Sequence, residues 1–437
     1  MVMNKIELKK IDETLYYEKS EAGLDVYMLP NKNVNNYYLT LNVNYGSIHT
    51  EFKSKGDKSF NKVPNGIAHF LEHMMFYMPD GHTAHEFYNK TGAYINAATS
   101  YRLTFYEVLA STFFKENLDY LLKYVFMPCF KKDYIESEKK IIEEEINMGN
   151  DKVGTRINYE IQDMIFNNYK MKYKVAGKKE DITKINADNL SLVYNTFYQP
   201  SNMFLIITGN FNPTEAMAII NNTLKEFAFD EPKEIILKKQ KEIDKLACCE
   251  RKINVNVKTP RISIFYKIPH SIFNELNLEN YELGIYLSFI LQYNLGTNSE
   301  LNQRLLTEKI IKSSIGISCS TMKEKEYVII KFMAQTEYYD ETKKLILDKL
   351  NNLTFDDKFF IRRKRCYTAS IITETDNIEI MNSNIANDLI IEEKVVDDWF
   401  NRIEKLNIKK VKALLNVLKF NNEGVLISLP YEKKIDD

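Results

Sequence analysis

The sequence has few of the features that mark secreted or membrane proteins. Its five cysteines are an odd number, and Cys248 and Cys249 are direct neighbours rather than a CxxC pair. Free thiols in a reducing cytoplasm explain this better than a disulfide framework. No run of about 18 apolar residues occurs, and the start, Met1–Ile11, lacks the apolar core of a secretory signal. The sequence therefore predicts a cytoplasmic protein that has no membrane partner.

An excess of charge of one sign is also absent. The chain has 59 Lys and Arg against 60 Asp and Glu, a formal net charge of −1. This balance gives no reason to expect nucleic acid or an anionic membrane surface as a partner. At 437 residues the chain is too long for one ordinary core, so two domains of roughly 200 residues are predicted.

Histidine is scarce, yet two of the six histidines are four residues apart. Residues 69–73 read His-Phe-Leu-Glu-His. In a helix, His69 and His73 lie on one face, one turn apart, and Glu72 lies beside them. Two imidazoles with a nearby carboxylate are the core of a hydrolytic zinc site. The motif therefore predicts a zinc site on a helix.

The residues around this motif predict a helix with one buried face. Asn65 is predicted to be its N-cap. Apolar residues follow at helical spacing, and they are Ile67, Phe70, Leu71, Met74 and Met75. The metal-binding face would then lie at the edge of the core, where an ion can meet both ligands and substrate.

A catalytic zinc site needs a third protein ligand and leaves one position for water. The best candidate lies in a predicted helix over residues 133–148, which carries three adjacent glutamates. Glu145 follows Glu138 by two helical turns, so the two share a face, and Ile141 and Ile142 near that face are predicted to turn it inward. We choose Glu145 as the third ligand of one Zn²⁺ per chain. Glu138 is predicted to orient a ligand histidine.

The organisation of the chain indicates a duplicated domain. Leu103–Leu122 and Tyr327–Ile346 align without a gap at an offset of 224, each an apolar strand followed by a helix. The same offset places Tyr293–Thr297 opposite His69–His73. This counterpart contains no His, Cys or carboxylate, so a single metal site per chain is predicted.

A Lys- and Glu-rich stretch with little apolar periodicity divides the two halves. The predicted division is an N-terminal, zinc-bearing domain over residues 1–230, a linker over 231–252 and a homologous C-terminal domain without a metal site over 253–437.

Several motifs together resemble the pitrilysin/insulinase family of zinc peptidases. Gly66–Phe76 resembles the family signature, in which the thermolysin order is inverted to His-x-x-Glu-His. Asn96–Ser100 resembles the family's substrate strand, and Glu138–Asp151 resembles its distal glutamate helix. Tyr198–Asn210 resembles the end of its first domain. The length is similar to that of the short branch, which includes subunits of mitochondrial processing peptidase.

This resemblance implies a fold and an activity. The expected fold is α+β: two homologous domains, each an antiparallel-rich sheet packed against helices, in one half of a clam-like dimer that encloses a chamber. The expected activity is that of a zinc-dependent endopeptidase acting on small or unfolded peptides, with Glu72 as the catalytic base. The expected substrate-binding residues, which would hold an extended peptide as an added strand, are Asn96, Ala97, Ala98 and Thr99.

The sequence departs from the family pattern at one place. The family's C-terminal domain usually supplies an Arg and a Tyr, seven residues apart, that bind the substrate carbonyl. The matching positions here are Thr307 and Ser314, so both donors are absent. The departure predicts a heterodimer with a zinc-less paralogue that supplies them, with a homodimer as the second choice.

Other readings of the sequence stay open. The chain could be a non-catalytic peptide-binding or assembly subunit, or a zinc-dependent regulatory module. His82 and His85 are at helical spacing, but we interpret His82 as a loop residue and His85 as a first-turn residue of a helix that starts with a capping box at Thr83. A precursor or leader peptide is the first choice of substrate, and general peptide clearance is the alternative.

Overall fold

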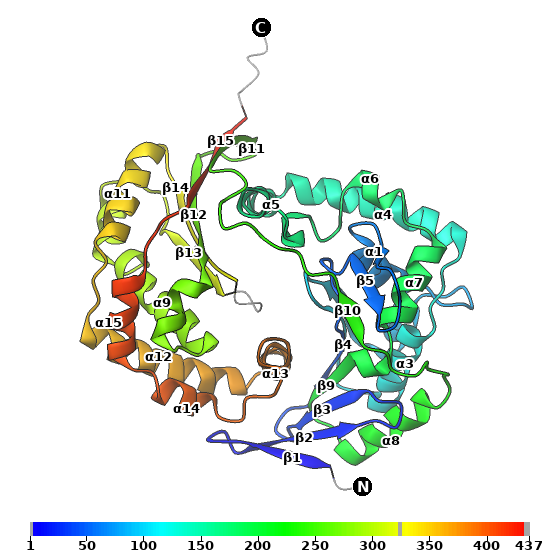
Figure 1. The fold of residues 1–437 in the computed structure, drawn as a ribbon. Helices are drawn as coiled ribbons and strands as arrows, with labels where there is room; N and C mark the ends of the chain where they lie inside the picture. Colours follow the sequence, from blue (N-terminus) through cyan, green and yellow to red (C-terminus); the bar gives the residue numbers. More distant parts are fainter. Residues whose placement is uncertain (1–2, 322–325, 432–437) are drawn as a thin grey trace. The chain divides into compact units, whose positions relative to one another are not determined.

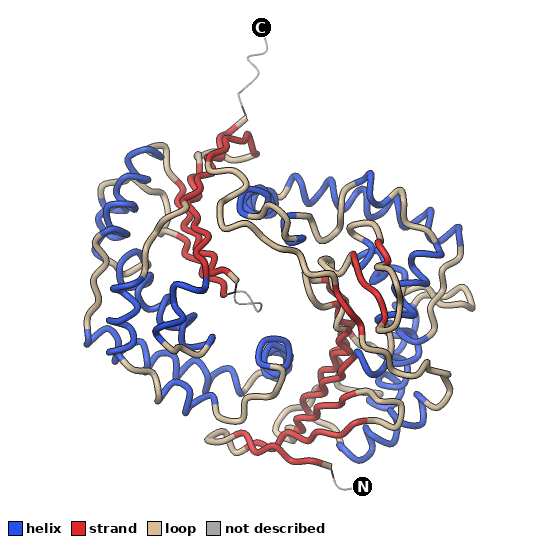
Figure 2. The backbone as a smooth tube through the Cα atoms, viewed as in Figure 1, coloured by secondary structure: helices blue, strands red, loops and turns tan. Residues whose placement is uncertain are grey.

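The computed structural model describes residues 3–321 and 326–431 (Figure 1). These residues form two compact units. Unit 1 contains the described residues within 1–147, 173–239 and 370–400, and unit 2 contains those within 148–172, 240–369 and 401–437. Each unit is an α+β body with helices and a sheet of its own, which confirms the predicted fold class (Figure 2).

The compact units differ from the division suggested by the sequence. Residues 148–172 belong to unit 2, and residues 370–400 belong to unit 1. Such exchanges depend on contacts between distant segments, which composition and spacing do not encode. The division into 1–230, 231–252 and 253–437 therefore stays a prediction about sequence domains.

Unit 1 is built on a seven-stranded sheet with the order β1-β2-β3-β9-β4-β8-β7. The pairs are antiparallel except β3 with β9. The strands are β1 (Asn4–Leu8), β2 (Glu13–Lys19), β3 (Asp25–Pro30), β4 (Tyr37–Val43), β7 (Tyr94–Thr99), β8 (Thr104–Ala110) and β9 (Met203–Gly209). A small second sheet holds β5 (Glu51–Ser54), β6 (Asn61–Lys62) and β10 (Ile235–Leu237).

Helices cover both faces of the larger sheet. On one face, α1 contacts β7 and β8, and α3 contacts β4 and β8. The core there is formed by residues such as Leu39, Leu41 and Tyr106, all fully buried. The helices that lie wholly within unit 1 are α1 (Ile67–Met74), α2 (Ala84–Thr91), α3 (Phe114–Phe126), α6 (Lys179–Ile182), α7 (Ala187–Phe197), α8 (Pro213–Leu224) and α13 (Ile378–Glu392).

The helix α13 packs on the other face of this sheet, against β4 and β9. Its Asn382 joins both strands, because it pairs with Thr40 Oγ1 at 2.6 Å and donates to the Ile206 carbonyl at 3.2 Å. Thr208 Oγ1 donates to the carbonyl of Ile378 at 2.8 Å. Buried polar groups that find such partners fix one register of packing. The sheet therefore holds α13 in a defined position.

Unit 2 is built on a five-stranded sheet with the order β11-β15-β12-β14-β13. Only β11 and β15 pair in parallel. The strands are β11 (Glu250–Val255), β12 (Arg261–Pro269), β13 (Gly316–Thr321), β14 (Tyr327–Gln335) and β15 (Glu423–Pro430). The helices are α5 (Val153–Ile165), α9 (Asn280–Leu295), α10 (Glu300–Thr307), α11 (Tyr339–Asn351), α14 (Trp399–Glu404) and α15 (Ile408–Val417), with α14 beginning at the end of unit 1. Two more helices, α4 (Lys132–Asp151) and α12 (Asp357–Thr375), run from one unit into the other.

The two segments that align in sequence adopt the same local structure. β8 is followed by α3 in unit 1, and β14 is followed by α11 in unit 2. Shifting β8 and α3 by the offset of 224 reproduces the bounds of β14 and α11 to within one residue at each end. The predicted duplication of this strand–helix unit is therefore confirmed.

A buried ion pair lies inside unit 2. Lys267 on β12 pairs with Glu242 at 2.7 Å, and both side chains are almost fully buried. Glu242 also accepts hydrogen bonds from the backbone N–H groups of Asn167, Asn168 and Tyr169. Burial alone would raise the pKa of Glu242, but the Lys267 bond and these three donors outweigh it and lower the pKa to about 2. Part of the predicted linker over residues 231–252 is thus buried.

Replacing Glu242 by Gln is expected to lower the free energy of unfolding by about 3–5 kcal/mol, because it leaves the Lys267 charge buried and unpaired. The carboxylate has a lower pKa when folded, so its contribution is complete above the usual pKa of about 4.3 and is lost as the pH falls toward 2. Urea unfolding at pH 7 and at pH 3 measures both effects. Asp357→Asn, which breaks an exposed pair with Lys412, is the control and should change stability far less. Equal effects of the two variants at pH 7 would contradict this account.

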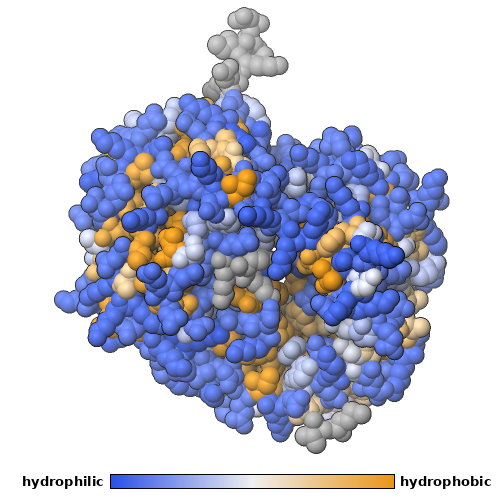
Figure 3. Space-filling view, viewed as in Figure 1, coloured by the Kyte–Doolittle hydropathy of each residue, from blue (hydrophilic) through white to orange (hydrophobic). Residues whose placement is uncertain are grey.

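No described helix is both long enough and apolar enough to cross a bilayer. On the face shown in Figure 3, hydrophilic side chains dominate and apolar patches are small. Exposed apolar residues that occur singly or in small groups are normal for a folded domain.

Candidate active site

The helix α1 positions two histidines and a glutamate. It begins after Gly66, whose φ of 84° lies in the left-handed region. A Cβ at this position would lie 2.5 Å from the carbonyl oxygen of Ala176, so only glycine fits. The prediction that Asn65 caps this helix is therefore wrong. Asn65 instead donates to Asp181 at 3.4 Å.

The buried face of α1 is the predicted one. All five residues of the apolar stripe are fully buried, and they are Ile67, Phe70, Leu71, Met74 and Met75. Their packing turns the neighbouring face, with His69, Glu72 and His73, toward the border of the core. His69 is 9% exposed and Glu72 is 6% exposed. These polar groups are thus fixed in place by apolar packing next to them.

The helix α4 brings two more carboxylates to this face. Glu138 is buried, and the side chain of Glu145 is 44% exposed. Ile142 is fully buried and holds this side of α4 against the core. Ile141 is 48% exposed, so the prediction that it also turns inward is wrong. Of Ile141 and Ile142, only Ile142 packs into the core, and it is enough to orient α4.

Three of the predicted residues form one group of potential metal ligands. Nε2 of His69 lies 3.6 Å from Glu145 Oε1, and Nε2 of His73 lies 3.5 Å from Glu145 Oε2. One ligand atom of each residue lies within 4.8 Å of the others. No other group of three such residues is found in the part of the chain that the structure describes.

The chemistry of these three donors fits zinc. Their nitrogen–oxygen distances are longer than a normal hydrogen bond, but they are close to the roughly 3.3 Å between ligands of a tetrahedral ion with bonds of about 2.0–2.1 Å. Burial, and then the charge of His73, lowers the pKa of His69 to about 3. His69 is therefore a neutral imidazole near pH 7, the form that binds a metal.

Glu138 and Tyr77 orient the second histidine. Nδ1 of His73 lies 2.7 Å from Glu138 Oε1, and the Tyr77 hydroxyl donates to Glu138 Oε2 at 2.6 Å. Burial opposes protonation of His73, but the hydrogen bond to Glu138 and the nearby carboxylates outweigh burial and raise its pKa. A carboxylate on the outer nitrogen leaves Nε2 for a metal. Glu138 thus stands where the sequence placed an orienting group.

Tyr77 was missed by the sequence reading. The signal that could have found it is its position four residues after His73, on the same side of a continuing helix. In the structure the helix ends at Met74, so Tyr77 reaches Glu138 from the segment that follows the helix.

Glu72 is held by the neighbouring strand β7. Thr99 Oγ1 donates to Glu72 Oε2 at 2.6 Å. Burial raises the pKa of Glu72, and the Thr99 hydrogen bond and the charge of His73 act against that rise. A carboxylate with a raised pKa that is held in place by Thr99 is suited to accept and return a proton.

The predicted substrate strand is an edge of the sheet. Among the described strands β7 pairs only with β8, so none of these strands pairs with its other side. Asn96, Ala97, Ala98 and Thr99 all lie on it. The Asn96 side chain donates to Glu107 Oε1 at 3.0 Å on β8. Only Thr99 is bonded to the group around the histidines.

The other predicted positions lie elsewhere. In unit 2, Thr307 is the last residue of α10 and donates to the Gln303 carbonyl, and Ser314 accepts from Asn302. His82 pairs with Glu86 in the first turn of α2. His85 stacks on Phe76. The capping box at Thr83 is confirmed.

Comparison with known proteins identifies the family. Residues 31–179 match the model of the insulinase family, peptidase family M16, and residues 184–357 match the model of the peptidase M16 inactive domain. The two matches follow one another over most of the chain. The fold, and the group formed by the His-x-x-x-His pair (His69 and His73) with Glu145, are those of an M16 protein. The chain belongs to the M16 (insulinase) peptidase family.

Two curated relatives come from Bacillus subtilis. The chain is 35% identical over 273 residues to the uncharacterized zinc protease YmfH. This match covers 62% of the chain and 64% of YmfH. It is 25% identical over 210 residues to the putative zinc protease AlbF. This match covers 48% of the chain and 48% of AlbF. The matches thus span about half to two thirds of the length of these relatives.

Solved structures share the fold. A putative M16-like peptidase from Alicyclobacillus acidocaldarius has a TM-score of 0.86 at 22% identity, covering 97% of this chain and 100% of that one. A chain of complex III2 from Candida albicans has a TM-score of 0.71 at 13% identity, covering 94% and 95%. At these identities the likeness shows the fold alone.

Proposed function

We propose that this chain is a zinc-dependent endopeptidase that cleaves small or unfolded peptides. The observation that carries the proposal is the convergence of His69, His73 and Glu145 on one point, with Glu72 beside them. Relatives described as zinc proteases support it. We also propose the cytoplasm as its compartment, which the five unpaired cysteines favour.

The residues of the site have separate tasks in this proposal. His69, His73 and Glu145 would hold the zinc ion, which lowers the pKa of a coordinated water to about 7 and polarises the peptide carbonyl. Glu72 Oε accepts the proton of the attacking water and returns it to the leaving amine. The Thr99 hydroxyl fixes Glu72 for both transfers. Glu138, held by Tyr77, keeps Nε2 of His73 turned toward Glu145.

The edge strand β7 offers a way to hold the substrate. An extended peptide can add to it as a further strand, so that backbone pairing gives affinity without demanding one sequence. Thr99, at the end of β7, is bonded to Glu72, so a peptide paired there would run beside the base. We propose Asn96, Ala97, Ala98 and Thr99 as the residues that bind it, with precursor or leader peptides as substrates.

We further propose that a zinc-less paralogue completes the enzyme as a clam-like dimer around a chamber. The support is the presence of Thr307 and Ser314 where the family usually has Arg and Tyr. A chain with this fold in complex III2 shows that such folds occur in assemblies. A homodimer is the second choice.

Adding the zinc-less paralogue is expected to raise peptidase activity by on the order of 10²–10³, because preorganised donors at the substrate carbonyl contribute about that much. The measurement is cleavage of a quenched fluorescent peptide library by the zinc-loaded chain, alone and with the paralogue. Full activity of the chain alone would contradict the heterodimer. If the zinc-loaded chain cleaved no peptide, either alone or with the paralogue, the proposed peptidase activity would be contradicted.

A further inference from the structure

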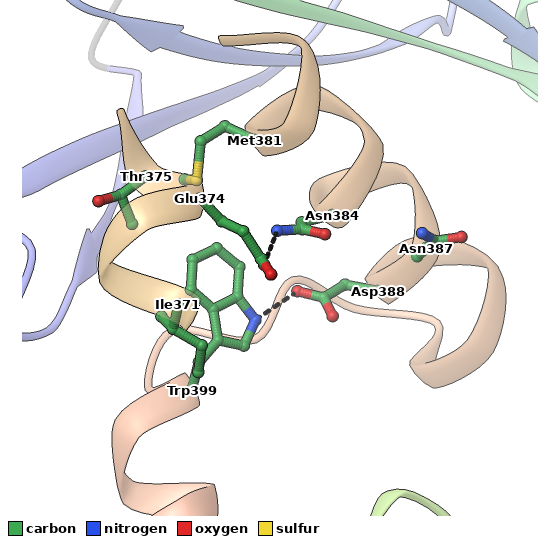
Figure 4. A pocket seen from close by; sticks show the side chains of 8 residues that line it. All are labelled: Ile371, Glu374, Thr375, Met381, Asn384, Asn387, Asp388 and Trp399. Carbon is green, nitrogen blue, oxygen red and sulfur yellow. Dashed lines mark hydrogen bonds between the residues drawn. The ribbon is translucent and has the colours of Figure 1, made fainter. Parts of the chain in front are cut away.

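A small cavity lies in unit 1, away from the residues described above. It forms where the end of α12, the outer side of α13 and Trp399 meet, and its volume is about 170 Å³ (Figure 4). Its lining includes Ile371, Glu374, Met381, Asn384, Asp388 and Trp399. Because α13 is held to the sheet through Asn382, this wall of the cavity is preformed.

One wall of the cavity is an indole ring. Trp399 Nε1 donates to Asp388 Oδ2 at 3.2 Å, and the same oxygen accepts from the backbone N–H of Val396 at 3.0 Å. Figure 4 shows the ring between the side chains of Ile371 and Glu374. No other ring and no cation among the described residues contacts it. The ring is thus fixed in orientation, packed against an apolar cluster, and it lines the cavity, where a cation can reach it.

The cavity also has negative charge that its own walls do not neutralise. Among the residues that the structure describes, Glu374 accepts hydrogen bonds only from neutral groups, Ser370 Oγ at 2.8 Å and Asn384 Nδ2 at 3.4 Å. None of the residues that line the cavity is Lys or Arg. Glu374 also lies in the last turn of α12, where the helix dipole disfavours a carboxylate. A carboxylate that has no basic neighbour in the cavity and lies at the unfavourable end of a helix dipole indicates a site for a cation.

We propose that this cavity binds the ammonium or guanidinium group of a basic amino-acid side chain. Glu374 would accept charge-assisted hydrogen bonds, and the Trp399 ring would attract the cation through its face. Ile371 and Met381 would contact the methylene groups of the side chain. This site goes beyond the proposed peptidase activity and does not depend on it.

The protein carries its own reporter for this site, because Trp399 is its single tryptophan. Titration of the full chain with acetyl-Ala-Lys-Ala-amide is expected to change Trp399 fluorescence in a saturable way. The matched peptide with norleucine in place of Lys should give no such change. No saturable change with the Lys peptide, or an equal change with both peptides, would overturn the proposal. n-Butylammonium carries the same methylene groups and ammonium as the Lys side chain and should give the same saturable change. No change with n-butylammonium would overturn the side-chain assignment.

Two variants at one position test the role of the carboxylate. Glu374→Gln keeps the shape of the side chain and one of its two acceptor oxygens but removes its charge, and it is expected to weaken Lys-peptide binding about tenfold or more. Glu374→Lys supplies its own ammonium and should abolish binding. Glu379→Gln, which changes an exposed glutamate in the first turn of α13 outside the cavity, is the control and should bind like the unaltered chain. Unchanged affinity in both position-374 variants would overturn the proposal.

Discussion

Replacing Glu72 by Gln is expected to lower peptide turnover by roughly 10² or more while zinc stays bound. Glutamine has nearly the same shape and can still accept the Thr99 hydrogen bond, but it cannot take a proton from water. Glu72 is not one of the three ligand residues, so metal content should not change. The measurement is kcat on a fluorescent peptide with the paralogue present, together with zinc content by elemental analysis.

Glu144→Gln is the matched control for this variant. Glu144 is an exposed glutamate one residue before the ligand Glu145, and it belongs to no group around the histidines. It should retain full turnover. If Glu72→Gln also retained full turnover with zinc bound, Glu72 would be excluded as the base.

Replacing His73 by Ala is expected to remove the metal, and activity with it. Loss of an outer partner of a ligand histidine typically costs 10–100-fold in metal affinity, so loss of the ligand itself should cost more than roughly 10²-fold. The purified native chain should hold one zinc per chain, and the variant close to none. Dialysis against a zinc buffer of known free concentration, followed by elemental analysis, measures this.

A stability measurement separates loss of metal from loss of fold. A ligand that binds only the folded state raises the melting temperature by mass action. Added zinc should therefore raise the melting temperature of the native chain but not of His73→Ala. His82→Ala, at an exposed histidine paired with Glu86, should behave like the native chain in both assays. One tightly bound zinc in His73→Ala would contradict the assigned ligands.

The local parts of the site could be read from the sequence. The spacing of His69, Glu72 and His73 and the apolar stripe of α1 depend only on helical geometry, and the structure contains both. Glu145 lies on a second helix and was chosen from its helical spacing to Glu138, and the family resemblance agrees with that choice. The structure brings it within 3.6 Å of His69.

What the sequence could not predict depends on contacts between distant segments. Ile141 is apolar but exposed, because only one side of α4 meets the core. Lys267 and Glu242 look like surface charges in sequence and are buried against each other. The packing of α13 on β4 and β9, and with it the cavity beside Trp399, joins segments about 170 residues apart or more. The periodicity of apolar residues along the sequence does not predict which distant segments pack together.

The free side of β7 has a consequence for the behaviour of the protein in concentrated solution. Backbone donors and acceptors do not distinguish a peptide from a strand of another molecule, so the same edge invites self-association. The strand is only six residues long and begins at Tyr94, which is 58% exposed. Its brevity limits how many bonds an unwanted neighbour can form. Reversible capture and resistance to aggregation are thus opposing demands on a single short segment.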